Sequence, residues 1–166
     1  MPARCLTLAL LLGMSLSTLA APWSQLPPIP DAEGFAYSFA GVSGGALIVA
    51  GGANIPGDKW AEPLHKVWYD STYVLPKPDG QWQLGPRLAR PLGYGVSITV
   101  DDSVICIGGS DEKEHTAEVF RLSWRDGHFA ASPKMPPLPR PCANFCGALL
   151  GRTIYVAGGL EMPTAT

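Results

Sequence analysis

Two Arg-Pro pairs, Arg90-Pro91 and Arg140-Pro141, lie 50 positions apart and are the first residues here that suggest a polar site. Asp111, Glu112 and His115 lie between them. Carboxylates and imidazoles are the groups that most often accept and donate protons in enzymes. The structural alternative is that each Arg-Pro pair caps and aims the strand after it, and that Asp111-Glu112-Lys113-Glu114 forms a solvated loop.

Motifs of several catalytic classes are missing from the sequence. It has no serine-nucleophile elbow and no metalloprotease helix motif. His65 and His115 lack the spacing of metal ligands, so we predict no metal site. The Gly-Gly pairs are not phosphate loops, since no helix follows them.

These residues are placed by an internal repeat. An apolar run leads into Gly51-Gly52, Gly108-Gly109 and Gly158-Gly159, at intervals of 57 and 50 residues. Two aromatic residues nine positions apart follow the first two glycine pairs, Tyr73 with Trp82 and Phe120 with Phe129. A period near 50 with a double glycine and spaced aromatics is typical of kelch blades, so we predict an all-β, kelch-type β-propeller.

Each repeat is predicted to contain four strands. The small-residue segments 35–42, 93–100 and 144–149 are the expected inner strands, and the strand ending in Gly-Gly comes next. Third strands are predicted around 67–75 and 118–124. The turns Asp79-Gly80 and Asp126-Gly127 then lead to outer strands with Trp82 and Phe129. The glycines are expected to adopt positive φ where the strand ends.

This up-and-down order predicts where a site would form. The links after each glycine pair and the links between blades emerge on the same face of a propeller. Segments 53–66, 110–117 and the chain from 160 should therefore meet segments 85–92 and 133–142. The polar side chains expected on this face are Lys59, His65, Arg90, Asp111, Glu112, His115, Arg140 and Glu161.

The N-terminus predicts export. Residues 1–20 read as a signal peptide, with a basic start, an uncharged apolar run and small residues at Thr18-Leu19-Ala20. A retained N-terminal anchor is the alternative. Residues 21–166 are the predicted partial propeller, located in the periplasm or secreted, with no membrane association after cleavage. Charged residues are 16% of the chain and its net charge is −2, which does not favour a nucleic-acid partner.

The exported part contains three cysteines, Cys106, Cys142 and Cys146. Cys142 and Cys146 are four positions apart in an extended segment, roughly 13 Å at strand rise, which is too far for a disulfide. We expect the three cysteines to be small buried apolar residues.

Several segments resemble a known family of kelch propellers. Residues 34–53, 66–73, 80–82 and 94–109 resemble the late blades of bacterial N-acetylneuraminate epimerases, also called sialate mutarotases. Residues 138–159 resemble an early blade of these proteins. Because late blades come first here, the order is similar to that of the cyclically permuted mutarotases, and the resemblance covers about residues 23–160.

This resemblance implies a six-bladed propeller that interconverts anomers of N-acetylneuraminate or a related sugar outside the cytoplasm. It implies no cofactor, a monomeric full-length protein and a sugar as the partner. Arg90 and Arg140 are the implied contacts for the sugar carboxylate or hydroxyls, with Tyr94 and Asp111 as further substrate-binding candidates. No residue is assigned as the catalytic acid or base.

The length predicts an incomplete propeller. At about 50 residues per blade, residues 21–166 make about two and a half blades, whereas propellers usually close with 4 to 8. We therefore expect an N-terminal fragment that is inactive alone, with ring closure by several copies as an alternative. A propeller that binds a glycan or protein without catalysis is the alternative to an enzyme.

Overall fold

The structure is a computed structural model that describes residues 23–58, 60 and 62–162. The predicted signal peptide and Lys59 lie outside these residues. Regular structure in the described part is all strand, and no helix there is long and apolar enough to cross a membrane. The strands are β1 (Phe39–Ser43), β2 (Ala46–Ala50), β3 (Ala53–Asn54), β4 (Val67–Trp68), β5 (Thr72–Leu75), β6 (Gln83–Leu84), β7 (Val96–Val100), β8 (Ser103–Ile107), β9 (Val119–Leu122), β10 (Trp124–Arg125), β11 (His128–Phe129), β12 (Ala143–Leu150) and β13 (Thr153–Leu160).

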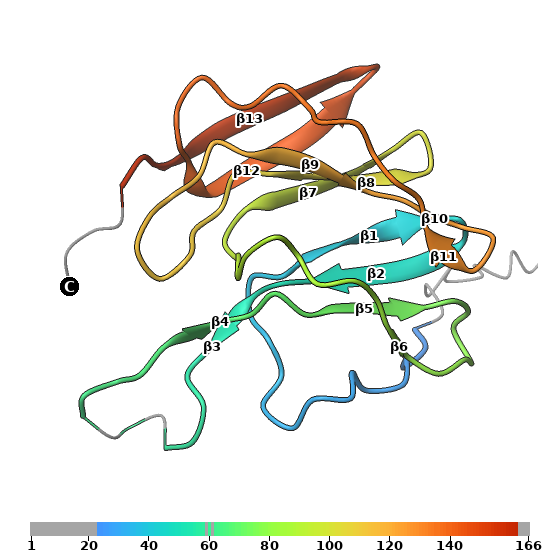
Figure 1. The fold of residues 1–166 in the computed structure, drawn as a ribbon, viewed down its shortest axis with the longest axis horizontal. Coiled ribbons are helices and arrows are strands. Elements are labelled where there is room, and N and C mark those ends of the chain that lie inside the picture. Colours follow the sequence, from blue (N-terminus) through green and yellow to red (C-terminus); the bar gives the residue numbers. More distant parts are fainter. Residues whose placement is uncertain (1–22, 59, 61, 163–166) are drawn as a thin grey trace, which may run out of the picture.

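Three of the five antiparallel sheets in the described residues follow one another along the chain and pack in the same order (Figure 1). The other two are the short ribbons β3-β4 and β10-β11. The first has the order β1-β2-β5-β6, as predicted for a four-stranded blade. The second has the order β7-β8-β9, and the third consists of β12 and β13. The alternation of tight turns and apolar strands thus builds three repeats of one up-and-down unit.

The glycine pairs end the second strand of the first two repeats, whereas β13 continues through Gly158-Gly159. All six glycines have positive φ, from 57° at Gly108 to 115° at Gly109, as the sequence predicts. Opposite Gly51-Gly52, the predicted strand 67–75 is divided into β4 and β5, with Tyr69–Ser71 outside both. The Gly51 N–H donates to the Ser71 carbonyl and the Tyr69 N–H to the Gly52 carbonyl, so the third strand follows the bend.

The outer strands differ between repeats. β6 begins directly after Trp82, whose indole N–H donates to the Pro27 carbonyl at 2.8 Å. In the second repeat Phe129 lies in β11, which pairs with β10 rather than with β9. Asp126 and Gly127 have φ of 51° and 81°, as a two-residue hairpin with a primed turn requires.

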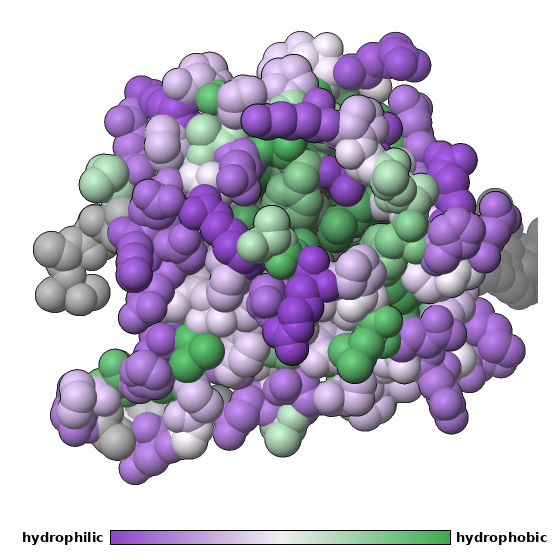
Figure 2. All heavy atoms as spheres, viewed as in Figure 1, coloured by the Kyte–Doolittle hydropathy of each residue, from purple (hydrophilic) through white to green (hydrophobic). Residues whose placement is uncertain are grey.

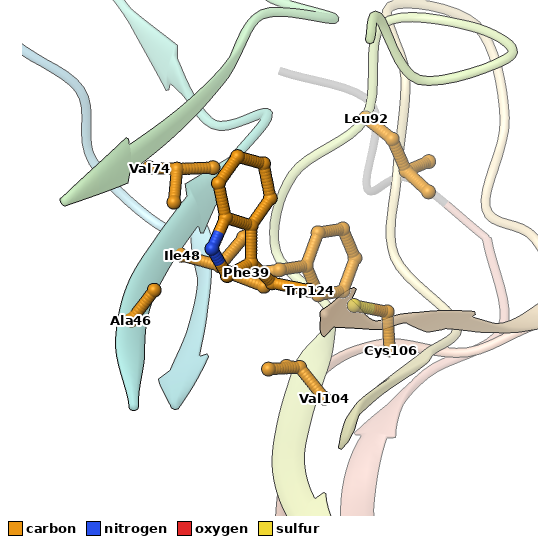
Figure 3. Packing of buried hydrophobic residues seen from close by; sticks show 8 residues of the cluster. All are labelled: Phe39, Ala46, Ile48, Val74, Leu92, Val104, Cys106 and Trp124. Atoms are coloured by element: carbon orange, nitrogen blue, oxygen red, sulfur yellow. The ribbon is translucent and has the colours of Figure 1, made fainter. Parts of the chain in front are cut away.

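Two apolar cores lie on opposite faces of β8. Val104 and Cys106 pack with Phe39 and Ile48 of the first sheet, as Figure 3 shows. Ile105 and Ile107 belong to the second core, which contains Phe145 of β12. All five residues of β8 are buried, which explains why this strand is a continuous apolar run rather than an alternating one.

The cysteines only partly follow the expectation from sequence. Cys106, Cys142 and Cys146 are all free, and Cys106 is fully buried. Burial raises the pKa of the Cys106 thiol far above its ordinary value. Cys146 is exposed, so the prediction of a buried apolar residue is wrong at this position, which lies on the third sheet.

Candidate functional site

Three equivalent residues mark the inner end of each repeat. Tyr37, Tyr94 and Asn144 each lie 14 positions before the first glycine of their repeat. All three adopt the left-handed conformation, with φ of 58°, 62° and 56°. This conformation costs a tyrosine about 1–2 kcal/mol, and such strain is concentrated at functional sites.

A chain of backbone hydrogen bonds joins these three residues. The Tyr94 N–H donates to the Tyr37 carbonyl at 3.0 Å, and the Asn144 N–H donates to the Tyr94 carbonyl at 2.9 Å. The inner ends of the three repeats are therefore held in register. Tyr37 lies just before β1, Tyr94 lies just before β7, and Asn144 is the second residue of β12.

Aromatic rings and one lysine gather at Tyr94. The rings of Tyr37 and Tyr94 stack with centroids 4.2 Å apart. The Lys66 Nζ lies 4.0 Å from the centroid of the Tyr94 ring and 4.8 Å from that of Trp68. Both distances are within the range of cation–π attraction. Lys66, at the end of the link 53–66, and Trp68 of β4 thus lie at the inner end of the second repeat.

Lys66, Trp68 and Tyr94 line an open pocket of about 630 Å³. Its wall combines aliphatic, aromatic and acidic side chains with one lysine and one histidine, and most of them come from the links that follow the glycine pairs. The lining residues are Ile55, Glu62, Leu64, Lys66, Trp68, Tyr94, Ser110, Asp111, Glu112, His115, Asn144 and Leu160.

Asp111 is held in place by three groups. It accepts hydrogen bonds from the backbone N–H groups of Lys113 and Glu114 at 2.8 and 2.9 Å, and Arg90 Nη1 lies 3.1 Å from its Oδ2. Partial burial acts to raise the pKa of Asp111, but the two N–H groups and Arg90 outweigh it and hold the pKa below its ordinary value. Asp111 therefore offers the pocket an ionised hydrogen-bond acceptor at neutral pH.

The two Arg-Pro arginines form equivalent ion pairs. Arg90 Nη1 also lies 2.9 Å from Glu114 Oε1, and Arg140 Nη1 lies 2.6 Å from Glu161 Oε1. Asp111 and Glu161 occupy the same position in their repeats, two residues after the second glycine. The Arg90 side chain is 29% exposed and that of Arg140 74%, so only the second pair lies in open solvent.

His115 is buried and its Nδ1 lies 2.8 Å from the Leu160 carbonyl oxygen. A carbonyl can only accept a hydrogen bond, so Nδ1 carries a proton. When the ring is neutral, Nε2 is therefore an acceptor. The contact also ties the link after the second glycine pair to the third repeat.

The structure brings some predicted site residues together and separates others. Tyr94, Asp111, Glu112 and His115 line the 630 Å³ pocket. Arg90 lies behind Asp111 and instead borders a cavity of about 220 Å³ between the first two repeats. His65 borders a neighbouring cavity of about 320 Å³.

Lys66, Trp68 and Asn144 were not predicted as site residues. Asn144 shares its place in the repeat with Tyr94, so the repeat alignment alone contained the signal for it. Lys66 is the last residue of the link 53–66, which was expected on this face, but it was not selected from that link. Trp68 lies in the predicted strand 67–75 and carried no such signal. Within residues 23–58, 60 and 62–162, no cluster of three or more His, Cys, Asp or Glu is arranged to hold a metal ion.

The arrangement suits a polyhydroxylated ligand. Tyr94 and Trp68 give the pocket an apolar aromatic wall, while Asp111, Glu112 and Ser110 can bond the hydroxyls of a sugar. Lys66 adds one positive charge at the aromatic wall.

Comparisons with known proteins agree on one family. A family profile for N-acetylneuraminate epimerase matches residues 13–130. The N-acetylneuraminate epimerase of Salmonella enteritidis PT4 is 41% identical over 118 residues, and that of Yersinia enterocolitica serotype O:8 is 39% identical over 122. Each match covers 63% of this chain and 30% of the relative, so the chain spans less than a third of these relatives' length.

A solved structure described as "Structure of YjhT", a β-propeller, superposes with a TM-score of 0.60 at 25% sequence identity. The superposition covers 68% of this chain and 34% of that one. The prediction of an all-β propeller is thereby confirmed.

Proposed function

The chain belongs to the N-acetylneuraminate epimerase family, and on this premise we propose that it forms part of a propeller that interconverts the anomers of N-acetylneuraminate or a related sugar. The observation that carries the proposal is the pocket at the inner ends of the repeats. Its aromatic wall and its ionised acceptor, Asp111, are of the kind that binds a sugar ring.

Anomer exchange opens and closes the sugar ring. One group must take the proton of the anomeric hydroxyl, and another must protonate the ring oxygen. His115 is the candidate acceptor in this chain, since its protonated Nδ1 leaves Nε2 free to accept. No partner acid is assigned, and the reaction requires no cofactor or metal.

We propose that four residues serve substrate binding, three by contact and Arg90 indirectly. Tyr94 contacts the sugar through the edge of its ring, because Tyr37 and Lys66 cover its two faces, and Asp111 accepts a hydroxyl hydrogen bond. Arg90 acts through Asp111, which it holds ionised and in place. Arg140 has an exposed guanidinium, and exposed ion pairs contribute little, so a sugar hydroxyl or carboxylate can replace Glu161.

The proposal extends to the whole protein. Since the chain spans 30% of its relatives' length, we propose that activity requires further blades, six in all, and that the closed propeller is a monomer. Residues 1–20 act as a signal peptide, and the protein works in the periplasm or after secretion.

The second candidate function is a propeller that binds a glycan or protein without chemistry. It is supported by the same aromatic and acidic pocket wall, since these groups bind a sugar whether or not a reaction follows. Binding alone predicts saturable association with no effect on the rate of anomer exchange.

Exchange NMR distinguishes these functions. The rate of interconversion of N-acetylneuraminate anomers would be measured for the 166-residue chain and for a chimera that adds the unmatched blades of the Salmonella enteritidis relative. We expect acceleration by the chimera and not by the shorter chain. Binding without acceleration in both proteins would support the second function, and a chimera that neither binds nor accelerates would exclude both.

A further inference from the structure

Lys66 differs from the arginines near the site because it has no acidic partner. Arg90 is paired with Asp111 and Glu114, and Arg140 with Glu161. Among the residues that the structure describes, Lys66 forms no ion pair within 4.0 Å. A half-buried lysine without a counter-ion is costly unless something else compensates its charge. Here two aromatic rings hold the ammonium group at the wall of the pocket.

A second donor lies beside it. The indole N–H of Trp68 is buried and has no hydrogen-bond partner among the described residues. Buried donors are almost always satisfied, so each unsatisfied one needs an explanation. Lys66 lines the pocket beside this buried donor and, in the described part of the chain, has no counter-ion, which favours an occupant with acceptor oxygens.

Acidic side chains also line the pocket. They are Glu62, Asp111 and Glu112, and among the described residues only Asp111 has a cationic partner. Carboxylates accept hydrogen bonds from hydroxyl groups and repel anions. A ligand that satisfies both the lysine and these carboxylates has one anionic group and several hydroxyls, and a doubly charged phosphate fits less well.

We infer that Lys66 binds the carboxylate of a sugar acid, with Tyr94 and Trp68 positioning its ammonium group. This inference rests on the proposed function and assigns the charge recognition within it to a lysine outside the Arg-Pro motif. Arg90 then keeps its structural pairing with Asp111, and the hydroxyls of the sugar face Asp111 and Glu112.

The test separates charge recognition from binding in general. Affinities of the 166-residue chain for N-acetylneuraminate and for its uncharged carboxyl methyl ester would be measured by NMR titration, with the Trp68 indole N–H signal as the local probe. We expect the acid to bind about ten-fold more tightly than the ester, the size of one charge-assisted hydrogen bond. Lys66→Met should abolish this preference because it weakens the binding of the acid and leaves the binding of the ester unchanged.

Two variants serve as controls. Lys66→Arg keeps the charge and should keep most of the preference. Lys113→Met removes a charge from a neighbouring cavity and should leave the preference unchanged within about two-fold. A far-ultraviolet circular dichroism spectrum like that of the unmodified chain would show that each variant is folded.

Three results would overturn the inference. If Lys66→Met weakens the binding of the acid and of the ester equally, Lys66 has a merely structural role. Equal affinity of the unmodified chain for both ligands would exclude charge recognition while leaving sugar binding intact. Binding of neither ligand would contradict the inference together with the proposed sugar site.

Discussion

One glycine of each of the first two pairs holds adjacent repeats together through a backbone hydrogen bond. The Gly52 N–H donates to the Leu92 carbonyl and the Gly109 N–H to the Cys142 carbonyl, both at 2.8 Å. Leu92 and Cys142 each follow an Arg-Pro pair, so the segment that leads into one repeat packs against the glycines of the repeat before it. A Cβ atom on Gly51 would overlap the Leu92 carbonyl oxygen.

Substitution of these glycines is therefore expected to have two different costs. Gly51→Ala meets both the Leu92 carbonyl and a φ of 64°, so it should lower the free energy of unfolding by more than about 3 kcal/mol. Gly158→Ala has a φ of 79° but no atom within 4 Å of the new Cβ, so it should cost only about 1–2 kcal/mol. Urea denaturation of both variants measures the difference, and equal costs would mean that the close approach to Leu92 is unimportant.

The two arginines should also differ in their effect on stability. Arg90 is half-buried and contacts two carboxylates, so Arg90→Ala should cost about 1–2 kcal/mol at pH 7. Arg140 is exposed, so Arg140→Ala should lower the free energy of unfolding by less than about 0.5 kcal/mol. The Arg140→Ala variant should instead lose sugar affinity, and a large loss of stability with unchanged affinity would favour the capping role of the Arg-Pro pair.

The cost of Arg90→Ala should depend on pH. The pKa of Asp111 is lowered in the folded protein, so its ionisation stabilises the fold above the ordinary value of 3.8. This contribution is lost as the pH falls through the lowered pKa. The difference in unfolding free energy between the unmodified chain and Arg90→Ala should therefore shrink between pH 7 and pH values below 3.8. A difference that is constant with pH would contradict the pairing with Asp111.

The sequence predicted the glycine conformations but not those of Tyr37 and Tyr94. A double glycine after an apolar strand indicates positive φ because glycine, which has no Cβ, adopts this conformation without steric cost. A tyrosine in the left-handed region contradicts local preference, so only its hydrogen bond to the next repeat explains it. The repeat order predicted that the links after the glycine pairs come together, and most residues that line the pocket come from these links, whereas none comes from 85–92 or 133–142. Of its aromatic wall, Tyr94 was a predicted substrate-binding residue and Trp68 was missed.

At the scale of elements, side-chain hydrogen bonds connect strands of neighbouring repeats that have no backbone hydrogen bonds to each other. The first strand of a repeat has a free edge, and along β1 the N–H groups of Ala40 and Val42 donate to the hydroxyls of Ser97 and Thr99 in β7. At the opposite end, the buried Ser43 hydroxyl donates to the Asp102 carbonyl at 2.7 Å and accepts from the Trp124 N–H at 2.8 Å. One serine thus connects the ends of two repeats.

Ser43→Ala should consequently be more harmful than Ser97→Ala. Loss of the buried hydroxyl leaves the Trp124 N–H without a partner, and an unsatisfied buried donor costs about 1–3 kcal/mol. Ser97 lies where water can replace its hydroxyl, so its loss should cost about 0.5 kcal/mol. Thermal unfolding of the two variants measures this difference, and equal melting temperatures would show that Ser43 is not a junction residue.

Strand positions were predicted better than strand boundaries. The apolar strands before each glycine pair agree with β2, β8 and β13, because burial and turn residues define them locally. The interruption at Tyr69–Ser71 depends on the bend in a neighbouring strand, and the separate β10–β11 hairpin depends on packing of Trp124 in the core. Both depend on contacts between segments distant in sequence.

Over the whole molecule, burial falls from the first two repeats to the third. β2 and β8 are covered, whereas most residues of β13 are exposed although it is the equivalent strand. Figure 2 shows hydrophobic side chains exposed in a hollow that hydrophilic side chains surround. The glycine repeat predicted an inner strand at 144–149 and a strand that ends in Gly158-Gly159, but the burial of these strands depends on what packs against them.

The exposed face of β13 should make the 166-residue chain associate with itself. Tyr155 is 57% exposed and Val156 42%, and among the described residues β13 pairs with β12 alone. A long apolar edge strand is a template for pairing with another chain, whereas charged side chains prevent such pairing. Val156→Lys should raise the concentration at which light scattering detects aggregates, without lowering the melting temperature.

The matched control is Leu84→Lys, which places the same charge on the exposed edge strand β6. β6 has only two residues and offers few backbone groups for pairing, so this change should have little effect on aggregation. An equal effect of both substitutions would assign the change to net charge rather than to β13. A specific effect of Val156→Lys would mean that β13, like β8, carries a sequence suited to burial on both faces, and that its second face requires a further blade.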